Sequence, residues 1–257
     1  MTVRRRELRR CEGSSRPPGR VVASAALVVG LLLAGCTSAV STQGRNRAKS
    51  QGTIVVPTTV PSTSTTVPPP FTSSVATVTA DDLGGSWHSG CPVGPSELRA
   101  LQLTYWGFDG RAHTGTMVVN AGVVQPVIQV FSTLYTSRFP ISQMVPMSVF
   151  GGDDNAAAAA DNTSSFDCRY AVASGPPHWS MHAYGEAIDV NTVENPYVSG
   201  ATLIPPAGAA YLDRGNVRAG MAEVGGTLVD AFAAVGWQWG GRWTNPVDYQ
   251  HFSVNGR

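Results

Sequence analysis

Lysine is almost absent from this chain of 257 residues, because Lys49 is the one lysine among eighteen basic residues. The formal net charge is only +1, and the chain has no basic stripe. Nucleic-acid binding usually needs a basic patch, so that class of function has little support. The HExxH motif is also missing, which excludes a zinc site carried by two histidines on one helix. No internal repeat is visible.

The chain has no apolar run of the roughly 20 residues that a membrane-spanning helix needs. The run VVASAALVVGLLLAG, residues 21–35, follows an N-terminal segment with seven arginines. This order is typical of a secretory signal peptide. The run ends in LAGC, which resembles a bacterial lipobox and makes Cys36 the lipidated residue. We therefore expect residues 1–35 to be a lipoprotein signal peptide; the alternative is an ordinary signal peptide with a chance cysteine.

Cysteine is scarce as well, with four in the chain. Cys11 would leave with the signal peptide and Cys36 would carry lipid. Cys91 and Cys168 then remain as an even pair in an oxidising compartment. We expect them to form one disulfide that closes a loop of roughly 77 residues. Two buried free thiols are the alternative.

Residues 36–80 are predicted to be a spacer. The stretch TTVPSTSTTVPPPFTSS is rich in Ser, Thr and Pro and has no charged residue. Such a composition cannot build a core, and proline favours an extended backbone. The spacer would hold the folded residues 81–257 at the extracytoplasmic face of the membrane, within the cell wall.

Periodicity in residues 81–257 predicts one domain of the α+β class, with a small antiparallel sheet and flanking helices. The expected helices are residues 123–139 and 226–236, with a short alanine helix in the loop 151–165. The expected strands are two around the FDG turn of residues 101–120, followed by residues 143–150, 165–172, 186–191 and 251–255.

The run HWSMHAYGEAID, residues 178–189, places His182 and Asp189 on either side of Gly185. Strand alternation puts Asp189 on the face opposite Ile188 and Val190. Glycine allows a tight turn, through which His182 can fold back toward Asp189. Two converging polar groups are costly to bury unless a cation compensates them.

The second polar group lies in WTNPVDYQHF, where Asp248 and His251 are three residues apart. The preceding Asn-Pro favours a turn, which would present both side chains together. His182, Asp189 and His251 then form a set of two histidines and one carboxylate, which suits zinc with one open position. Asp248 is placed to act as general base and later as general acid.

These motifs resemble those of the zinc peptidases that trim bacterial cell-wall peptides. SMHAYGEAID matches their SxHxxGxAxD pattern, and Trp243, Asp248 and His251 match their W…DxxH pattern. The family includes VanY-type D-alanyl-D-alanine carboxypeptidases, D-Ala-D-Ala dipeptidases and L-alanyl-D-glutamate endopeptidases. DNTSSFDCR and NPYV are similar to one branch, so the resemblance covers roughly residues 110–253.

The resemblance implies a LAS/Hedgehog-type zinc peptidase fold, with Zn²⁺ bound by His182, Asp189 and His251 and with Asp248 as catalytic acid and base. It also implies an active-site arginine before the first histidine. We place this arginine at Arg169, with Arg138 as the alternative. Ser180 is a candidate to bind substrate or to cap the turn.

The implied activity is hydrolysis of peptidoglycan stem peptides by a monomeric enzyme that is lipid-anchored to the cell membrane. D-alanyl-D-alanine carboxypeptidase is the first expectation for the reaction. L-alanyl-D-glutamate endopeptidase is the alternative within the same family. A non-catalytic, zinc-containing lipoprotein that binds the cell wall is the alternative from another class.

Overall fold

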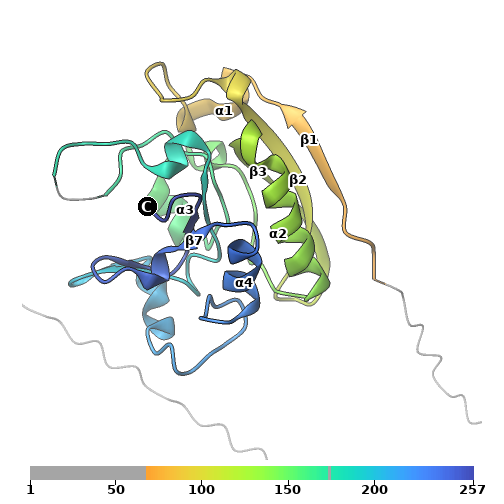
Figure 1. Ribbon diagram of the computed structural model, residues 1–257, viewed down its shortest axis with the longest axis vertical. Coiled ribbons are helices and arrows are strands. Elements are labelled where there is room, and N and C mark those ends of the chain that lie inside the picture. Colours follow the sequence, from red (N-terminus) through yellow and green to blue (C-terminus); the bar gives the residue numbers. More distant parts are fainter. Residues whose placement is uncertain (1–67, 173–174) are drawn as a thin grey trace, which may run out of the picture. The chain divides into compact units, whose positions relative to one another are not determined.

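The computed structural model describes residues 68–172 and 175–257 (Figure 1). The predicted signal peptide, Cys36 and most of the predicted spacer lie outside these residues. The described part mixes helices with three small antiparallel sheets, which confirms the α+β class. None of its helices combines the length and the apolar character that crossing a membrane requires.

The first sheet has the order β1-β2-β3 and is antiparallel throughout. Its strands are β1 (Ser73–Thr77), β2 (Leu98–Trp106) and β3 (Ala112–Asn120). β2 and β3 form the predicted hairpin, since the FDG turn joins them. Helix α2 (Val124–Thr136) lies along this sheet in Figure 1 and buries Val127, Phe131 and Leu134, as their helical spacing predicted.

Strand β1 corrects the predicted boundary of the spacer, because residues 73–77 lie within the range 36–80. All five of its side chains are exposed. The strand is therefore held by its backbone pairing with β2, and Thr72 adds a bond from its backbone N–H to the Thr104 hydroxyl at 3.1 Å. Because this edge strand buries none of its side chains, it needs no apolar residues. Its Ser/Thr-rich composition therefore does not distinguish it from a spacer.

The two polar motifs meet in the second sheet, which has the order β4-β9-β7. Its strands are β4 (Ala187–Asp189), β9 (His251–Ser253) and β7 (Gln238–Trp239). β4 and β9 pair antiparallel in a register that puts Asp189 opposite His251. The third sheet, β6-β5-β8, consists of β6 (Thr202–Ile204), β5 (Tyr197–Ser199) and β8 (Val247–Asp248). It brings Tyr197 opposite Asp248.

The core that supports the second sheet lies on the face away from Asp189. Ile188 and Val190 belong to the main hydrophobic cluster, as alternation predicted. Helix α4 (Thr227–Ala233) contributes Phe232, which stacks on Phe252 of β9 at 4.1 Å between ring centroids. The strands that carry the polar motifs are therefore backed by packed apolar side chains.

Two predicted strands are wrong. In the first of these, residues 143–146 are irregular and the rest forms the 3-10 helix η4 (Met147–Phe150). Pro146 has no backbone N–H to donate to a strand ladder. Residues 165–172 are extended, but successive N–H groups bond to different partners. Phe166 donates to Val118 O, and Cys168 donates to Ser86 O. The segment therefore does not pair along its length with any single neighbouring strand.

The alanine helix is confirmed as α3 (Asp154–Ala159), and α4 ends at Ala233, three residues before the predicted Gly236. The disulfide between Cys91 and Cys168 is present in the structure. The remaining elements are short: α1 (Ala80–Leu83), η1 (Gly84–Ser86), η2 (Pro95–Glu97), η3 (Ala121–Val123), η5 (Met181–Tyr184), η6 (Pro206–Tyr211) and η7 (Gly240–Arg242).

Candidate metal centre

The first histidine of the site lies in a tight turn whose two ends are defined by Ser180 and Gly185. The Ser180 hydroxyl accepts a bond from the His182 backbone N–H at 3.3 Å and caps η5. Gly185 ends the turn with φ +69°, a conformation that favours glycine. A Cβ at this position would lie 2.6 Å from the backbone N of Asn120. The chain can therefore turn tightly against β3 and enter β4 two residues before Asp189.

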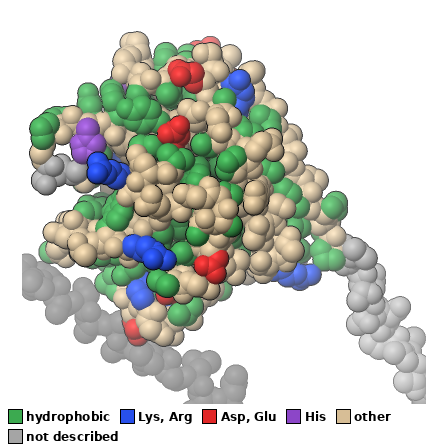
Figure 2. Space-filling model, in the orientation of Figure 1, with side chains coloured by type: hydrophobic (Ala, Val, Ile, Leu, Met, Phe, Trp, Pro, Cys, Tyr) green, Lys and Arg blue, Asp and Glu red, His purple; other side chains and the backbone are tan. Residues whose placement is uncertain are grey.

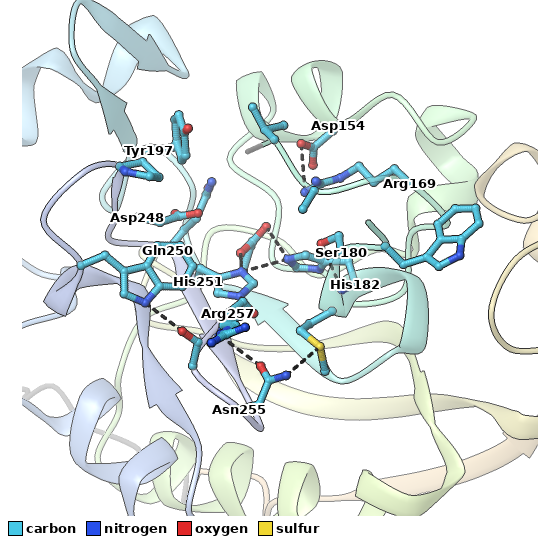
Figure 3. Close-up of a pocket in the computed structure, with 18 of the residues that line it drawn as sticks. Asp154, Arg169, Ser180, His182, Tyr197, Asp248, Gln250, His251, Asn255 and Arg257 are labelled. Carbon is cyan, nitrogen blue, oxygen red and sulfur yellow. Dashed lines mark hydrogen bonds and ion pairs between the residues drawn. The ribbon is translucent and has the colours of Figure 1, made fainter. Parts of the chain in front are cut away.

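Three buried side chains converge at this point, and Figure 3 shows two of them, His182 and His251, next to each other. His182 Nε2 lies 3.2 Å from Asp189 Oδ2, and His251 Nδ1 lies 3.2 Å from Asp189 Oδ1. The two ring nitrogens are 3.1 Å apart. The structure thus brings together the three residues that the sequence motifs predicted, although they come from η5, β4 and β9.

The opposite nitrogen of each ring contacts a backbone carbonyl. His182 Nδ1 lies 2.7 Å from Ser165 O, and His251 Nε2 lies 3.0 Å from Arg257 O. A carbonyl can only accept, so these nitrogens carry the hydrogen and donate. The other nitrogens then hold lone pairs when the rings are neutral. This is the second-shell arrangement that orients metal-ligating histidines.

The donor set fits a zinc ion by its chemistry. Two imidazole lone pairs that face each other at 3.1 Å repel unless a proton or a cation lies between them. Two nitrogens and one carboxylate oxygen are the ligands of catalytic zinc sites with an open position. The ligand atoms of His182, Asp189 and His251 all lie within 4.8 Å of one another. The three residues can therefore hold one divalent ion.

The charges of Asp189 and of the two histidines next to it stabilise one another. Burial by itself would raise the pKa of Asp189, but the charge and the hydrogen bond of His182, together with His251, hold this pKa well below its ordinary value. Burial opposes a charge on His182, yet the Asp189 carboxylate raises the pKa of this imidazole. Asp189 is therefore a permanent anion that attracts a cation, either a proton on the imidazole or a metal ion.

Asp248 lies next to this cluster at the end of β8, and a bend at residues 249–250 separates it from His251 in β9, so the two residues lie on strands and not on the single turn that the sequence predicted. The side chain is buried, and Oδ1 has no hydrogen-bond partner among the described residues. Burial, followed by the negative charge of Asp189, raises the pKa of Asp248 to about 7. A carboxyl group with such a pKa can accept and return a proton near neutral pH.

Arg169 reaches the same cavity from the extended segment that precedes η5. Its Nη2 lies 3.1 Å from Asp154 Oδ2, and its Nε lies 3.3 Å from Asp167 Oδ2. Arg138 instead packs over the ring of Trp106 at 4.7 Å and lines a separate hollow. Of the two arginines that the sequence offered, Arg169 is the one at the site.

The cavity around these groups has a volume of about 920 Å³ and contains every predicted metal and catalytic residue. Figure 2 shows its surface as a notch at the left of the view, beside a histidine, with arginine side chains at both rims. Further lining residues from four parts of the chain are Asp154, His178, Trp179, Tyr197, Ile204, Arg242, Trp243, Gln250, Asn255 and Arg257.

Sequence reasoning missed the groups that orient the ligands. The acceptors for His182 and His251 are backbone carbonyls of Ser165 and Arg257, and every residue has such a carbonyl, so no residue type marks them. Asp154 begins α3 in a segment that the sequence shows to be acidic, but only the fold brings it to Arg169.

Comparison with known protein families finds a match for part of the chain. Residues 174–254 match the model of a family described as D-alanyl-D-alanine carboxypeptidase. The matched range includes the three metal-ligand candidates and Asp248, whereas Arg169 lies just before it. No curated protein and no solved structure matches the chain.

Proposed function

We propose that this chain is a zinc peptidase of the D-alanyl-D-alanine carboxypeptidase superfamily, whose family model matches residues 174–254, and that it hydrolyses peptidoglycan stem peptides with one Zn²⁺. We propose D-alanyl-D-alanine carboxypeptidase activity as the reaction and a LAS/Hedgehog-type fold as its scaffold. The observation that carries the proposal is the convergence of His182, Asp189 and His251 beside the buried Asp248.

Zinc held by these three residues would act as a Lewis acid on the scissile carbonyl and on the attacking water. Asp248 accepts a proton from that water as its oxygen attacks the carbonyl carbon. The same carboxyl group then donates the proton to the leaving amine as the carbon–nitrogen bond breaks. Burial raises the pKa of this carboxyl group above its ordinary value, which makes it a stronger base for the first of these steps.

Arg169 supplies positive charge on the opposite side of His182 from Arg257 (Figure 3). Its two carboxylate partners hold the guanidinium in one orientation. We propose that it stabilises the negative charge that develops on the carbonyl oxygen, since preorganised donors lower the barrier most when they face developing charge. Ser180 caps η5 and also lines the cavity, so its hydroxyl can donate to a bound peptide.

Asp248→Asn in the zinc-loaded protein tests the proposal. The substrates are defined stem peptides, and mass spectrometry identifies the products. We expect a loss of about 10²–10⁴-fold in kcat with an unchanged zinc content, while Asp230→Asn on the exposed side of α4 leaves kcat at the wild-type value. Full activity of Asp248→Asn would remove this residue as the base.

The products also decide between the alternatives. Release of free D-alanine supports the carboxypeptidase, whereas cleavage after L-alanine supports the L-alanyl-D-glutamate endopeptidase. Binding of peptidoglycan without any product from the zinc-loaded protein would support the non-catalytic lipoprotein. The buried Asp248 argues against that last alternative, because a structural zinc site has no need of a proton acceptor beside it.

We further propose a monomer that is lipid-anchored to the extracytoplasmic face of the cell membrane. The support is the LAGC sequence ending at Cys36 and the Ser/Thr/Pro-rich residues that follow. Replacing Cys36 with alanine should move the protein from the membrane fraction to the soluble fraction. Retention in the membrane would place the anchor elsewhere.

A further inference from the structure

We propose that His88, Cys91 and Cys168 form a second metal site, which binds Zn²⁺ when the disulfide between the two cysteines is reduced. One ligand atom from each of these residues lies within 4.8 Å of the other two. Two sulfurs and one imidazole nitrogen are a known donor set of zinc sites that keep a fourth position for water. The inference goes beyond the proposed function and does not depend on it, since none of the three residues lines the cavity of the candidate metal centre.

Two of the three donors come from one tight turn, residues 88–91. The Cys91 backbone N–H donates to His88 O at 3.2 Å and closes the turn. Gly90 has φ +105°, in the region that favours glycine. His88 and Cys91 have two residues between them, which is a spacing common to paired ligands of structural zinc sites. The turn therefore presents an imidazole and a sulfur side by side.

The His88 ring directs a lone pair at the sulfur of Cys168. Its Nδ1 lies 3.1 Å from Ser89 O, and a carbonyl can only accept, so Nδ1 carries the hydrogen and donates. Nε2 then holds a lone pair when the ring is neutral, and it lies 3.5 Å from Cys168 Sγ. A disulfide sulfur has no hydrogen to donate, so this contact is not a hydrogen bond in the oxidised protein. After reduction, the same nitrogen and sulfur can bind one cation together.

The surroundings of Cys91 suit a thiolate. The His88 backbone N–H donates to Cys91 Sγ at 3.2 Å. A hydrogen bond to sulfur favours its negative charge, and the thiolate is the form of cysteine that binds metals. His88 is exposed and Cys91 is half-buried, whereas Cys168 is buried. An ion can therefore reach the three donors from the solvent without opening the core.

The conversion balances with a dithiol as the reductant. Each cysteine sulfur gains one electron and one proton, while the dithiol is oxidised to its own disulfide. Zn²⁺ then displaces the two thiol protons to the solvent. The two sulfurs separate to roughly 3.8 Å, which zinc–sulfur bonds of about 2.3 Å impose at a tetrahedral angle. The ion would thus keep Cys91 and Cys168 joined after the disulfide is lost.

Co²⁺ serves as the probe, because thiolate ligands give this ion a charge-transfer absorption that nitrogen and oxygen ligands do not. The candidate metal centre has no thiolate among its three ligands, so the absorption reports the second site alone. The full chain carries Cys11→Ser and Cys36→Ser, which leaves Cys91 and Cys168 as its cysteines. The dithiol is removed under nitrogen before Co²⁺ is added. We expect the absorption, and about one further equivalent of bound Co²⁺, in the reduced protein and in neither case in the oxidised protein.

His88→Ala in the same background removes one of the three ligands. We expect the affinity for thiolate-bound Co²⁺ to fall by more than about tenfold. His113→Ala is the matched control, because His113 is also exposed but pairs with Asp109, and its affinity should equal that of the parent. Parent affinity in His88→Ala would overturn the inference, as would a reduced protein that binds Co²⁺ without the absorption.

Near-ultraviolet circular dichroism shows whether the reduced protein stays folded. If reduction abolishes this signal and Co²⁺ does not restore it, the disulfide is purely structural and the inference fails. Hydrolysis of stem peptides by the oxidised, zinc-loaded protein is a separate measurement. Its failure would remove the proposed function and leave the second metal site standing.

Discussion

The Nδ1 atom of His182 lies 2.7 Å from the carbonyl oxygen of Ser165, which directs the Nε2 atom of the ring toward Asp189. The neighbouring residue, Ser164, exchanges two backbone hydrogen bonds with Asp189, at 3.0 Å and 2.9 Å. Residues 164 and 165 therefore orient two of the three metal-ligand candidates at once. The same segment continues to Cys168 and Arg169, so the disulfide and the candidate active-site arginine belong to the scaffold of the candidate metal centre.

The first prediction concerns the metal ligands. His182→Ala removes one of three donors, so zinc affinity should fall by more than the roughly 10–100-fold that follows loss of a second-shell partner. Competition with a chromophoric chelator measures this affinity. His113→Ala serves as the control, since His113 pairs with Asp109 in an exposed turn, and it should bind zinc as the wild type does. Wild-type affinity in His182→Ala would contradict the assignment.

The second prediction concerns the turn before β4. In Gly185→Ala the new Cβ would meet the Asn120 backbone at 2.6 Å, and the positive φ adds strain. Gly200→Ala shares a positive φ, +57°, but its Cβ would meet nothing within 4 Å. We expect Gly200→Ala to lower the unfolding free energy by about 1 kcal/mol and Gly185→Ala by several kcal/mol. Equal losses in urea unfolding would show that the close contact with Asn120 is unimportant.

The third prediction concerns the disulfide. Cys91 and Cys168 are separated by 77 residues along the chain, and a crosslink of this span restricts the unfolded chain strongly. Replacing both with serine should lower the unfolding free energy by about 2–5 kcal/mol, measured as a shift of the urea midpoint. Thiol counting on the denatured, unreduced wild type should find neither sulfur free. An unchanged urea midpoint would mean that the disulfide adds nothing to the stability that the other tertiary contacts already provide.

The fourth prediction concerns pH and Glu194, a buried residue outside the metal centre. Burial, followed by the charge of Asp161, raises the pKa of Glu194 from its ordinary 4.5 to about 7, against the hydrogen bond that Tyr211 donates at 2.9 Å. The folded state therefore favours the protonated carboxyl group. Its contribution is complete below pH 4.5 and is lost as the pH rises through about 7.

Glu194→Gln should remove this dependence. Between pH 5 and pH 8 the wild type should lose about 1–3 kcal/mol more unfolding free energy than the variant does. Both proteins are compared in a chelator, so that titration of the metal ligands affects them equally. The exposed Asp230→Asn variant should follow the wild type. Parallel pH profiles for Glu194→Gln and the wild type would show that Glu194 is ionised in the fold throughout this range.

Much of the candidate site could be predicted because its ligands follow local rules. Alternation alone assigned Ile188 and Val190 to the core and Asp189 to the opposite face, and the structure agrees. The motifs SMHAYGEAID and DxxH each contain a turn of a few residues. The side chains next to such a turn largely determine its conformation. The helix predicted over residues 123–139 is observed as α2 (Val124–Thr136), and its apolar spacing describes one buried face.

The wrong predictions concern segments whose structure depends on distant partners. Residues 165–172 look like a strand by composition, yet the N–H groups of residues 166, 167 and 168 donate in turn to Val118, His182 and Ser86. Residues 73–77 look like a spacer, yet β2 provides an edge with which they pair. Backbone hydrogen bonding takes no account of side-chain type, so composition cannot reveal these pairings.

The amino-acid sequence alone determined which residue types are available for metal binding and proton transfer, and in what short-range order, because turn chemistry and alternation act over a few residues. The tertiary structure alone decided that β4 and β9 are neighbours, that two main-chain oxygens orient the imidazoles, and that Asp154 and Asp167 compensate the charge of Arg169. These outcomes depend on contacts between segments far apart along the chain, and such contacts form only when the shared core is buried.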